Sequence, residues 1–127
     1  MIIEKIEHLS SRYLRFRVYL STYEYYDIGT KNKKTYIDGA SQEEKEKYWN
    51  KQLNKYAENL FLSSFTPSHV LFTCYLLWGK YRNINENKNW LNNILCKITH
   101  FPENYSWSSR YLNTYSIYNF YKNKKGV

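Results

Sequence analysis

Residues 60–78 read LFLSSFTPSHVLFTCYLLW, and this stretch decides how the rest of the chain must fold. Apart from Cys74 and Tyr75, His69 is its only ionisable side chain, and no Asp, Glu, Lys or Arg occurs between Asn59 and Gly79. A helix that crosses a bilayer needs about 20 apolar residues, so a single membrane span is one interpretation. The stretch also contains Ser, Thr and His side chains that lipid satisfies poorly. We therefore favour a helix buried in the core of a protein.

Pro67 divides this stretch in two. Thr66 is a suitable N-cap, and a proline is well tolerated at the first helical position because its missing N–H has no partner there anyway. We expect one helix to end near residues 61–64 and a second to begin at Pro67. The second is apolar on every side, which is typical of a buried helix. The prediction is an all-α fold of four or five helices around a buried central helix at about 67–82.

The N-terminal region carries apolar residues at alternating spacings of four and three. This heptad stripe predicts one long amphipathic helix over residues 2–26. The run Arg15-Phe16-Arg17-Val18 alternates as a strand would. The helix is preferred because the stripe covers more residues: Ile2, Ile6, Leu9, Tyr13, Phe16, Leu20 and Tyr23.

The clearest helix signal begins at Ser41. Ser41 and Glu44 have capping-box spacing, and Glu43 stands four residues before Lys47, so a helix is expected over about 42–63. Apolar periodicity predicts another helix over about 87–100, closed by Pro102. We expect residues 1–127 to form one helical domain, with a short helix over about 107–121. The alternative for the aromatic-rich tail 103–127 is a segment that is extended or bound to a partner.

Aromatic residues make up 20% of the chain, with 15 Tyr and 4 Trp. Tyr and Trp combine a large apolar area with one polar atom and are common in protein interfaces. A chain of 127 residues cannot bury so many rings. The composition therefore predicts aromatic surfaces that dock on other molecules.

The formal net charge is +8. Such a charge suits RNA, anionic lipid or an acidic protein neighbour, although the surplus of Lys and Asn is also what AT-rich codons produce. The tetrapeptide KNKK occurs at 31–34 and at 122–125, each time after a Tyr-rich segment. The candidate RNA or lipid contacts are Arg12, Arg15, Arg17, Lys31, Lys33, Lys34, Lys122, Lys124 and Lys125.

No catalytic, cofactor-binding or metal-binding residue is predicted, and the chain is expected not to be an enzyme. Cys96 and His100 have the spacing of two metal ligands on a helix, but two ligands do not make a site. Cys74 and Cys96 are expected to be buried free thiols. His69 is expected to be a hydrogen-bonded residue near a helix N-terminus. The N-terminus lacks the pattern of a signal peptide.

The whole composition resembles that of small divergent proteins encoded in AT-rich mitochondrial genomes, particularly those of ciliates. Tyr13-Leu14-Arg15-Phe16 is also similar to the leucine-tyrosine-arginine motif of small three-helix accessory proteins of respiratory complexes, with the first two residues in the opposite order. These resemblances imply a protein made in mitochondria, at the inner membrane or on its matrix side. We expect a non-catalytic accessory subunit of a respiratory-chain complex, in contact with other subunits and a membrane surface. The alternative is a divergent mitoribosomal protein that binds rRNA.

Overall fold

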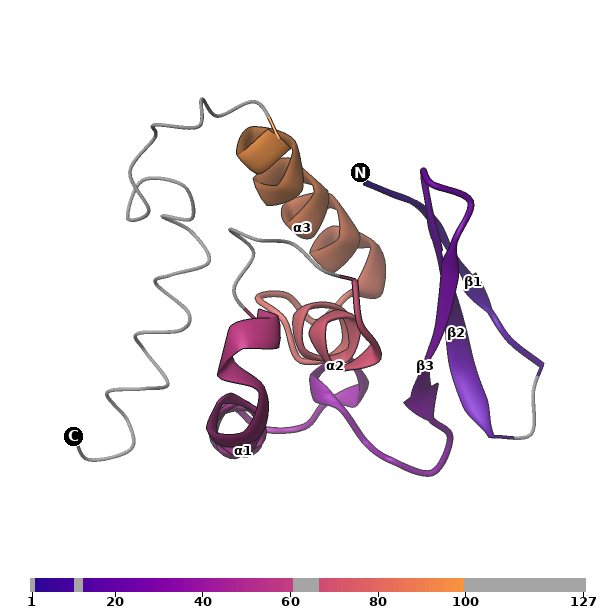
Figure 1. The fold of residues 1–127 in the computed structure, drawn as a ribbon. Helices are drawn as coiled ribbons and strands as arrows, with labels where there is room; N and C mark the ends of the chain where they lie inside the picture. The colour runs from indigo at the N-terminus through magenta and orange to yellow at the C-terminus, as the bar shows by residue number, and fades with distance from the viewer. Residues whose placement is uncertain (1, 11–12, 61–66, 100–127) are drawn as a thin grey trace.

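The computed structural model describes residues 2–10, 13–60 and 67–99. In these residues a three-stranded antiparallel sheet lies on one side of the molecule and the helices cover one of its faces (Figure 1). The strands are β1 (Ile3–His8), β2 (Leu14–Leu20) and β3 (Tyr25–Thr30), in the order β1-β2-β3. A 3₁₀ turn η1 (Tyr36–Asp38), α1 (Gln42–Leu60), α2 (His69–Phe72), a π-helical turn η3 (Thr73–Leu77) and α3 (Ile84–Thr99) follow. The fold is mixed α and β, so the all-α prediction is wrong.

The N-terminal region forms strands because its buried residues alternate. Phe16, Val18 and Leu20 point into the core, while the residues between them lie on the other face. Cross-strand pairs continue this pattern, with Phe16 opposite both His8 and Ile28. β-Branched and aromatic side chains pack well on such a pleated, half-buried surface. The apolar residues of this region are buried with a period of two residues, as in a strand, and not with the heptad spacing of a helix.

The predicted helix over residues 2–26 is therefore wrong. Two residues of its supposed buried stripe, Tyr13 and Tyr23, are 70% and 97% exposed. Val18, which lies off that stripe, is fully buried. Tyr23 also has a left-handed backbone, with φ of 67°, in the turn between β2 and β3. The apolar spacing of four and three was coincidental across three short segments.

Helix α1 begins as its capping box predicts. The Glu44 N–H donates to Ser41 Oγ at 3.1 Å, and the Ser41 N–H donates to a Glu44 carboxylate oxygen at 3.3 Å. Trp49, Leu53 and Leu60 of α1 are buried in the core. A kink occurs at Tyr56, where φ is −133° and ψ is 33°. The predicted helix over 42–63 is confirmed as far as Leu60, and residues 61–63 lie outside the described part.

The central segment is buried as predicted, but it is not one helix. Ser68 caps α2, accepting a hydrogen bond from the Leu71 N–H at 3.1 Å. The predicted cap Thr66 lies outside the described residues. The helix widens into the π-helical turn η3 and ends there, so residues 78–82 are not helical. Leu71 and Phe72 are buried, as is the whole run from Cys74 to Trp78.

Side chains from two other helices replace the backbone bonds that a longer helix would supply. Trp49 Nε1 donates to the Trp78 carbonyl at 2.6 Å, and Lys45 Nζ donates to the Gly79 carbonyl at 2.9 Å. The fully buried Asn87 donates through Nδ2 to the carbonyls of Leu76 and Tyr81. These bonds satisfy the polar groups exposed where the helix ends, which would otherwise be costly to bury.

Helix α3 starts three residues before the predicted position at 87. Asn83 caps it, because its Oδ1 accepts from the N–H groups of Asn85 and Glu86. Asn92 of α3 reaches back to β1, where it accepts from the Ile3 N–H and donates to the Ile3 carbonyl, both at 2.8 Å. The predicted helix over 107–121 and the tail 103–127 lie outside the described residues. Among the helices described, none is long and apolar enough to cross a membrane.

Candidate functional site

The outer face of the sheet, which the described helices leave uncovered, carries rings and charges in cross-strand rows. We define the outer face as Lys5, Glu7, Arg15, Arg17, Tyr19, Tyr25 and Asp27. Lys5, Tyr19 and Tyr25 form one row, and Glu7, Arg17 and Asp27 form the next. Opposed side chains in such rows lie close enough to interact. The sheet therefore assembles residues from three separate segments into one surface.

Arg17 is the centre of this surface. Its Nε and Nη2 donate to the two carboxylate oxygens of Asp27 at 2.7 and 3.1 Å. Its guanidinium carbon lies 4.2 Å from the centroid of the Tyr25 ring. The hydrogen bond from Arg17 lowers the pKa of Asp27 below its usual value. The same bond raises the pKa of Arg17, so the fork stays charged and held in place.

Arg15 connects the outer face to the 3₁₀ turn η1. Its two terminal nitrogens donate to the two carboxylate oxygens of Asp38 at 2.6 and 2.7 Å. Asp38 also accepts from the Thr35 N–H at 2.9 Å and from the Thr35 hydroxyl at 2.7 Å. The bonds from Arg15, and then those from Thr35, lower the pKa of Asp38 to about 2. The carboxylate is therefore ionised at all physiological pH values.

Lys5 completes the first row. Its Nζ lies 4.8 Å from the Tyr19 ring centroid and 3.6 Å from a carboxylate oxygen of Glu7. The centroids of the Tyr19 and Tyr25 rings are 6.1 Å apart. Each cation of the outer face thus has a carboxylate beside it, from Glu7, Asp27 or Asp38. The surface is rich in rings and arginine but carries little net charge.

The structure separates the contact residues predicted from the sequence. Arg15 and Arg17 come together on β2, but as parts of internal ion pairs. Lys33 and Lys34 are exposed in the segment between β3 and η1, and Lys31 is half-buried. The predicted contacts outside the described residues are Arg12, Lys122, Lys124 and Lys125. Sequence reasoning missed Lys5, Tyr19, Tyr25 and Asp27, although the alternation at 15–18 was the signal that would have placed them.

A second set of polar residues lies between α1 and η1. Lys45 Nζ and the guanidinium carbon of Arg82 each lie 4.0 Å from the centroid of the Tyr36 ring. Arg82 also donates to the Tyr36 and Ala40 carbonyls at 3.1 and 2.9 Å. Burial, and then the charge of Arg82, lowers the pKa of Lys45 to about 8. These contacts fasten η1 to α1, which gives them a structural role.

The candidate ligands and nucleophiles have ordinary surroundings. Cys74 is buried, and burial raises the pKa of its thiol, so the thiolate is disfavoured. Cys96 is exposed, contrary to the prediction, and His100 lies outside the described residues. His69 packs edge-on against Tyr26 at 5.1 Å between ring centroids. Within residues 2–10, 13–60 and 67–99, no group of three His, Cys, Asp or Glu side chains is placed to hold a metal.

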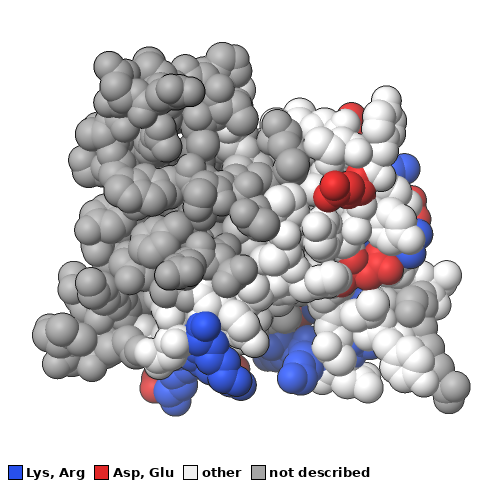
Figure 2. Space-filling model, viewed as in Figure 1, with Lys and Arg blue, Asp and Glu red and all other residues white. Residues whose placement is uncertain are grey.

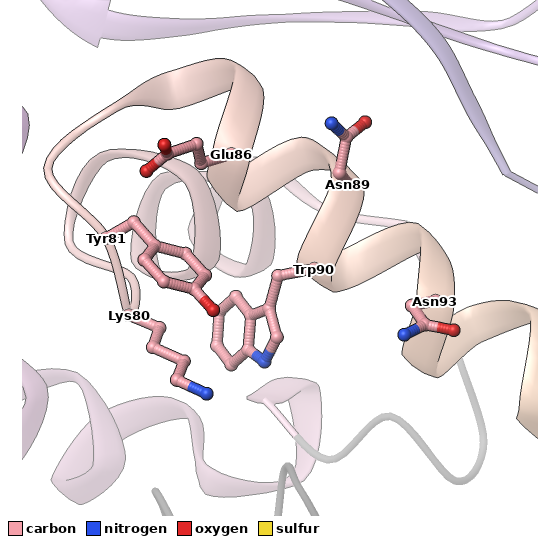
Figure 3. Close-up of a pocket in the computed structure, with 6 residues that line it drawn as sticks. All are labelled: Lys80, Tyr81, Glu86, Asn89, Trp90 and Asn93. Atoms are coloured by element: carbon pink, nitrogen blue, oxygen red, sulfur yellow. The ribbon is translucent and has the colours of Figure 1, made fainter.

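A pocket of about 520 Å³ opens beside the start of α3. Figure 3 shows the Tyr81 and Trp90 rings pointing toward each other, with Lys80 reaching to the same side. Glu86, Asn89 and Asn93 line it from α3. Among the described residues, the lining contains one carboxylate and one amine and no His, Cys or Ser.

Comparisons with protein-family models, with curated proteins and with solved structures find no match to this chain.

Proposed function

We propose that the protein is a non-catalytic structural subunit of a larger protein assembly, and that it docks on a protein neighbour through the outer face of its sheet. The observation that carries this proposal is the cluster of Tyr19, Tyr25 and Arg17 on an uncovered sheet face. Tyr and Arg are the residue types that contribute most binding energy in protein interfaces. Their side chains here are already oriented by cross-strand contacts, so docking would order few further rotamers.

The charge balance of the outer face favours protein over nucleic acid. Binding to a phosphate backbone gains free energy when unpaired cations displace counterions. Arg15 and Arg17 already donate to carboxylates in two-pronged pairs, so RNA would have to break these bonds or compete with Asp27 and Asp38. A protein partner can instead bury the rings and leave each pair intact.

The compositional resemblance to proteins of AT-rich mitochondrial genomes supports a respiratory-chain complex as the assembly. That proposal includes a location at the inner membrane or on its matrix side. A mitoribosomal role is the second candidate, because rings on an open sheet face are a common platform for stacking RNA bases. Exposed Lys33 and Lys34 add to that candidate.

Native purification of the tagged full-length chain separates these candidates. The proposal predicts recovery in a high-mass complex whose identified proteins include respiratory-chain subunits, and whose mass is unchanged by ribonuclease. If the complex sediments with ribosomal particles and is dispersed by ribonuclease, the mitoribosomal role replaces the respiratory-chain proposal. Recovery only as a free monomer would contradict both roles.

The docking surface is tested in the same preparation by two double variants. Tyr19→Ala with Tyr25→Ala removes the rings of the outer face and should weaken assembly by at least about 30-fold, since a single interface hot spot contributes about 2 kcal/mol or more. Tyr56→Ala with Tyr81→Ala removes two exposed rings elsewhere and is the matched control. Equal retention of both variants in the complex would show that the outer face is not the docking surface.

A further inference from the structure

Five exposed lysines lie along one edge of the molecule, away from the outer face of the sheet. We define this lysine edge as Lys33 and Lys34, before η1, together with Lys47, Lys51 and Lys55 of α1. The three lysines of α1 are four residues apart, so they form a stripe with steps of about 6 Å along the helix. Figure 2 shows Lys and Arg side chains gathered along the lower edge of the molecule, below α1 and the segment that leads into it.

The stripe lies on the face of α1 that points away from the core. Lys45, Trp49 and Leu53 form the buried face of this helix, about half a turn away from Lys47 and Lys51. Lys51 and Lys55 therefore extend into solvent without supporting the core.

Acidic residues do not cancel the charge along the whole edge. Exposed Glu43 and Glu44 stand in the first turn of α1, where they stabilise the positive end of the helix dipole. Glu43 pairs with Lys47 at 3.6 Å, and Asp38 is held by Arg15. Lys51 and Lys55 lie about two and three turns beyond the carboxylates of Glu43 and Glu44. In residues 51–60 of α1 the two lysines outnumber the one acidic residue, Glu58, so positive charge is in excess in this half of the helix.

We propose that the lysine edge rests on an anionic membrane surface, by attraction to phospholipid headgroups. Clusters of four to eight basic residues on an amphipathic helix are typical of binding to anionic lipid. The edge consists of lysine alone, a flexible point charge that suits a diffuse array of phosphates, whereas planar arginine is preferred for ordered RNA contacts. The arginines described, Arg15, Arg17 and Arg82, instead donate to carboxylates or carbonyls within the chain.

Co-sedimentation of the full chain with lipid vesicles tests this proposal directly. Vesicles of phosphatidylcholine alone are compared with vesicles of phosphatidylcholine and cardiolipin, at low salt and at about 0.5 M salt, where exposed charges are screened. We expect binding to the cardiolipin vesicles only, and release by salt. Because each lysine near an anionic surface contributes roughly fivefold in affinity, Lys51→Gln with Lys55→Gln should weaken binding roughly 25-fold.

A charge-matched control uses lysines outside the edge. Lys80→Gln with Lys88→Gln removes the same charge from the segment before α3 and from α3, and it should change vesicle affinity only a few-fold. Equal weakening by the two double variants would show attraction by net charge alone and would overturn the proposal. Absence of binding to cardiolipin vesicles would also overturn it. If the Lys51→Gln, Lys55→Gln variant in that case lost binding to a uridine homopolymer, the lysine edge would be assigned to RNA.

This proposal does not depend on docking through the outer face. If the Tyr19 and Tyr25 variants still assemble, binding to vesicles is still expected. If the protein does not bind vesicles, it can still dock through the outer face. Each experiment can therefore contradict one proposal without contradicting the other.

Discussion

Gly79 shows how tightly the end of the central segment is packed. A Cβ atom added there would lie 2.1 Å from the Tyr75 carbonyl oxygen and 3.0 Å from the side chain of Asn87. Because the obstacle is backbone, it cannot rotate away. Gly79 permits the close approach that lets the helix end inside the core.

Gly79→Ala should lower the free energy of unfolding by about 2–3 kcal/mol, as overpacking does in closed cores. Gly39→Ala is the comparison, because Gly39 has a positive φ of 103° but an added Cβ would meet only the Lys34 side chain, at an ordinary contact distance of 3.6 Å. That variant should lose only about 1 kcal/mol through its backbone conformation. Urea unfolding measures both, and a larger loss in the Gly39 variant would contradict the packing described for Gly79.

Burial of Lys45 makes the free energy of unfolding depend on pH in the alkaline range. Its pKa is about 8 in the folded protein and 10.5 ordinarily, so between these values the unfolded chain binds more protons than the folded one. Stability relative to a Lys45→Met variant should therefore rise from pH 8 to 10.5, by at most about 3 kcal/mol. Urea titrations of both proteins across this range measure the difference. A difference that falls with pH would show that the Gly79 carbonyl and the Tyr36 ring stabilise the ammonium of Lys45 more than burial destabilises it.

Asp38 gives a pH dependence of the same sign, but in the acid range. Its pKa is lowered from 3.8 to about 2, so its contribution is present above pH 4 and is lost as the pH falls toward 2. Asp38→Asn should cost about 1 kcal/mol at neutral pH, since the pair is partly exposed. The difference between the two proteins should vanish near pH 2. A constant difference across the acid range would mean that the ion pair contributes nothing.

At the scale of elements, β2 and the heptad stripe make opposite predictions for the same residues. Val18→Ala should cost about 1–3 kcal/mol, because Val18 is fully buried in the central strand. Tyr13→Ala and Tyr23→Ala should change stability by no more than about 0.5 kcal/mol, because both rings are exposed. Thermal unfolding of the three variants decides the matter. The reverse order of losses would favour a helix over residues 2–26.

The elements that sequence predicted best have local signals. The Ser41–Glu44 capping box fixed the start of α1, because both hydrogen bonds form within four residues. The end of the central helix had no such signal. The position where the central helix ends depends on hydrogen bonds from Lys45, Trp49 and Asn87, which belong to other helices. The spacing of apolar residues within 67–82 cannot predict those contacts. Likewise, Arg17 and Tyr25 meet only through the register of β2 and β3.

At the scale of the whole molecule, the fold separates two kinds of surface. The sheet presents rings beside paired charges, and α1 presents lysines on its solvent face. A subunit built in this way can contact a protein neighbour with one surface and an anionic layer with another. Neither surface requires catalytic groups.

The most direct test of the central claim is site-specific cross-linking within the native assembly. A photoreactive phenylalanine replaces Tyr25 on the outer face in one protein, and Tyr81 beside the α3 pocket in another. Docking through the outer face predicts a covalent adduct to one neighbouring protein from position 25 and none from position 81. An adduct from position 81 alone, or an adduct to RNA from position 25, would contradict it.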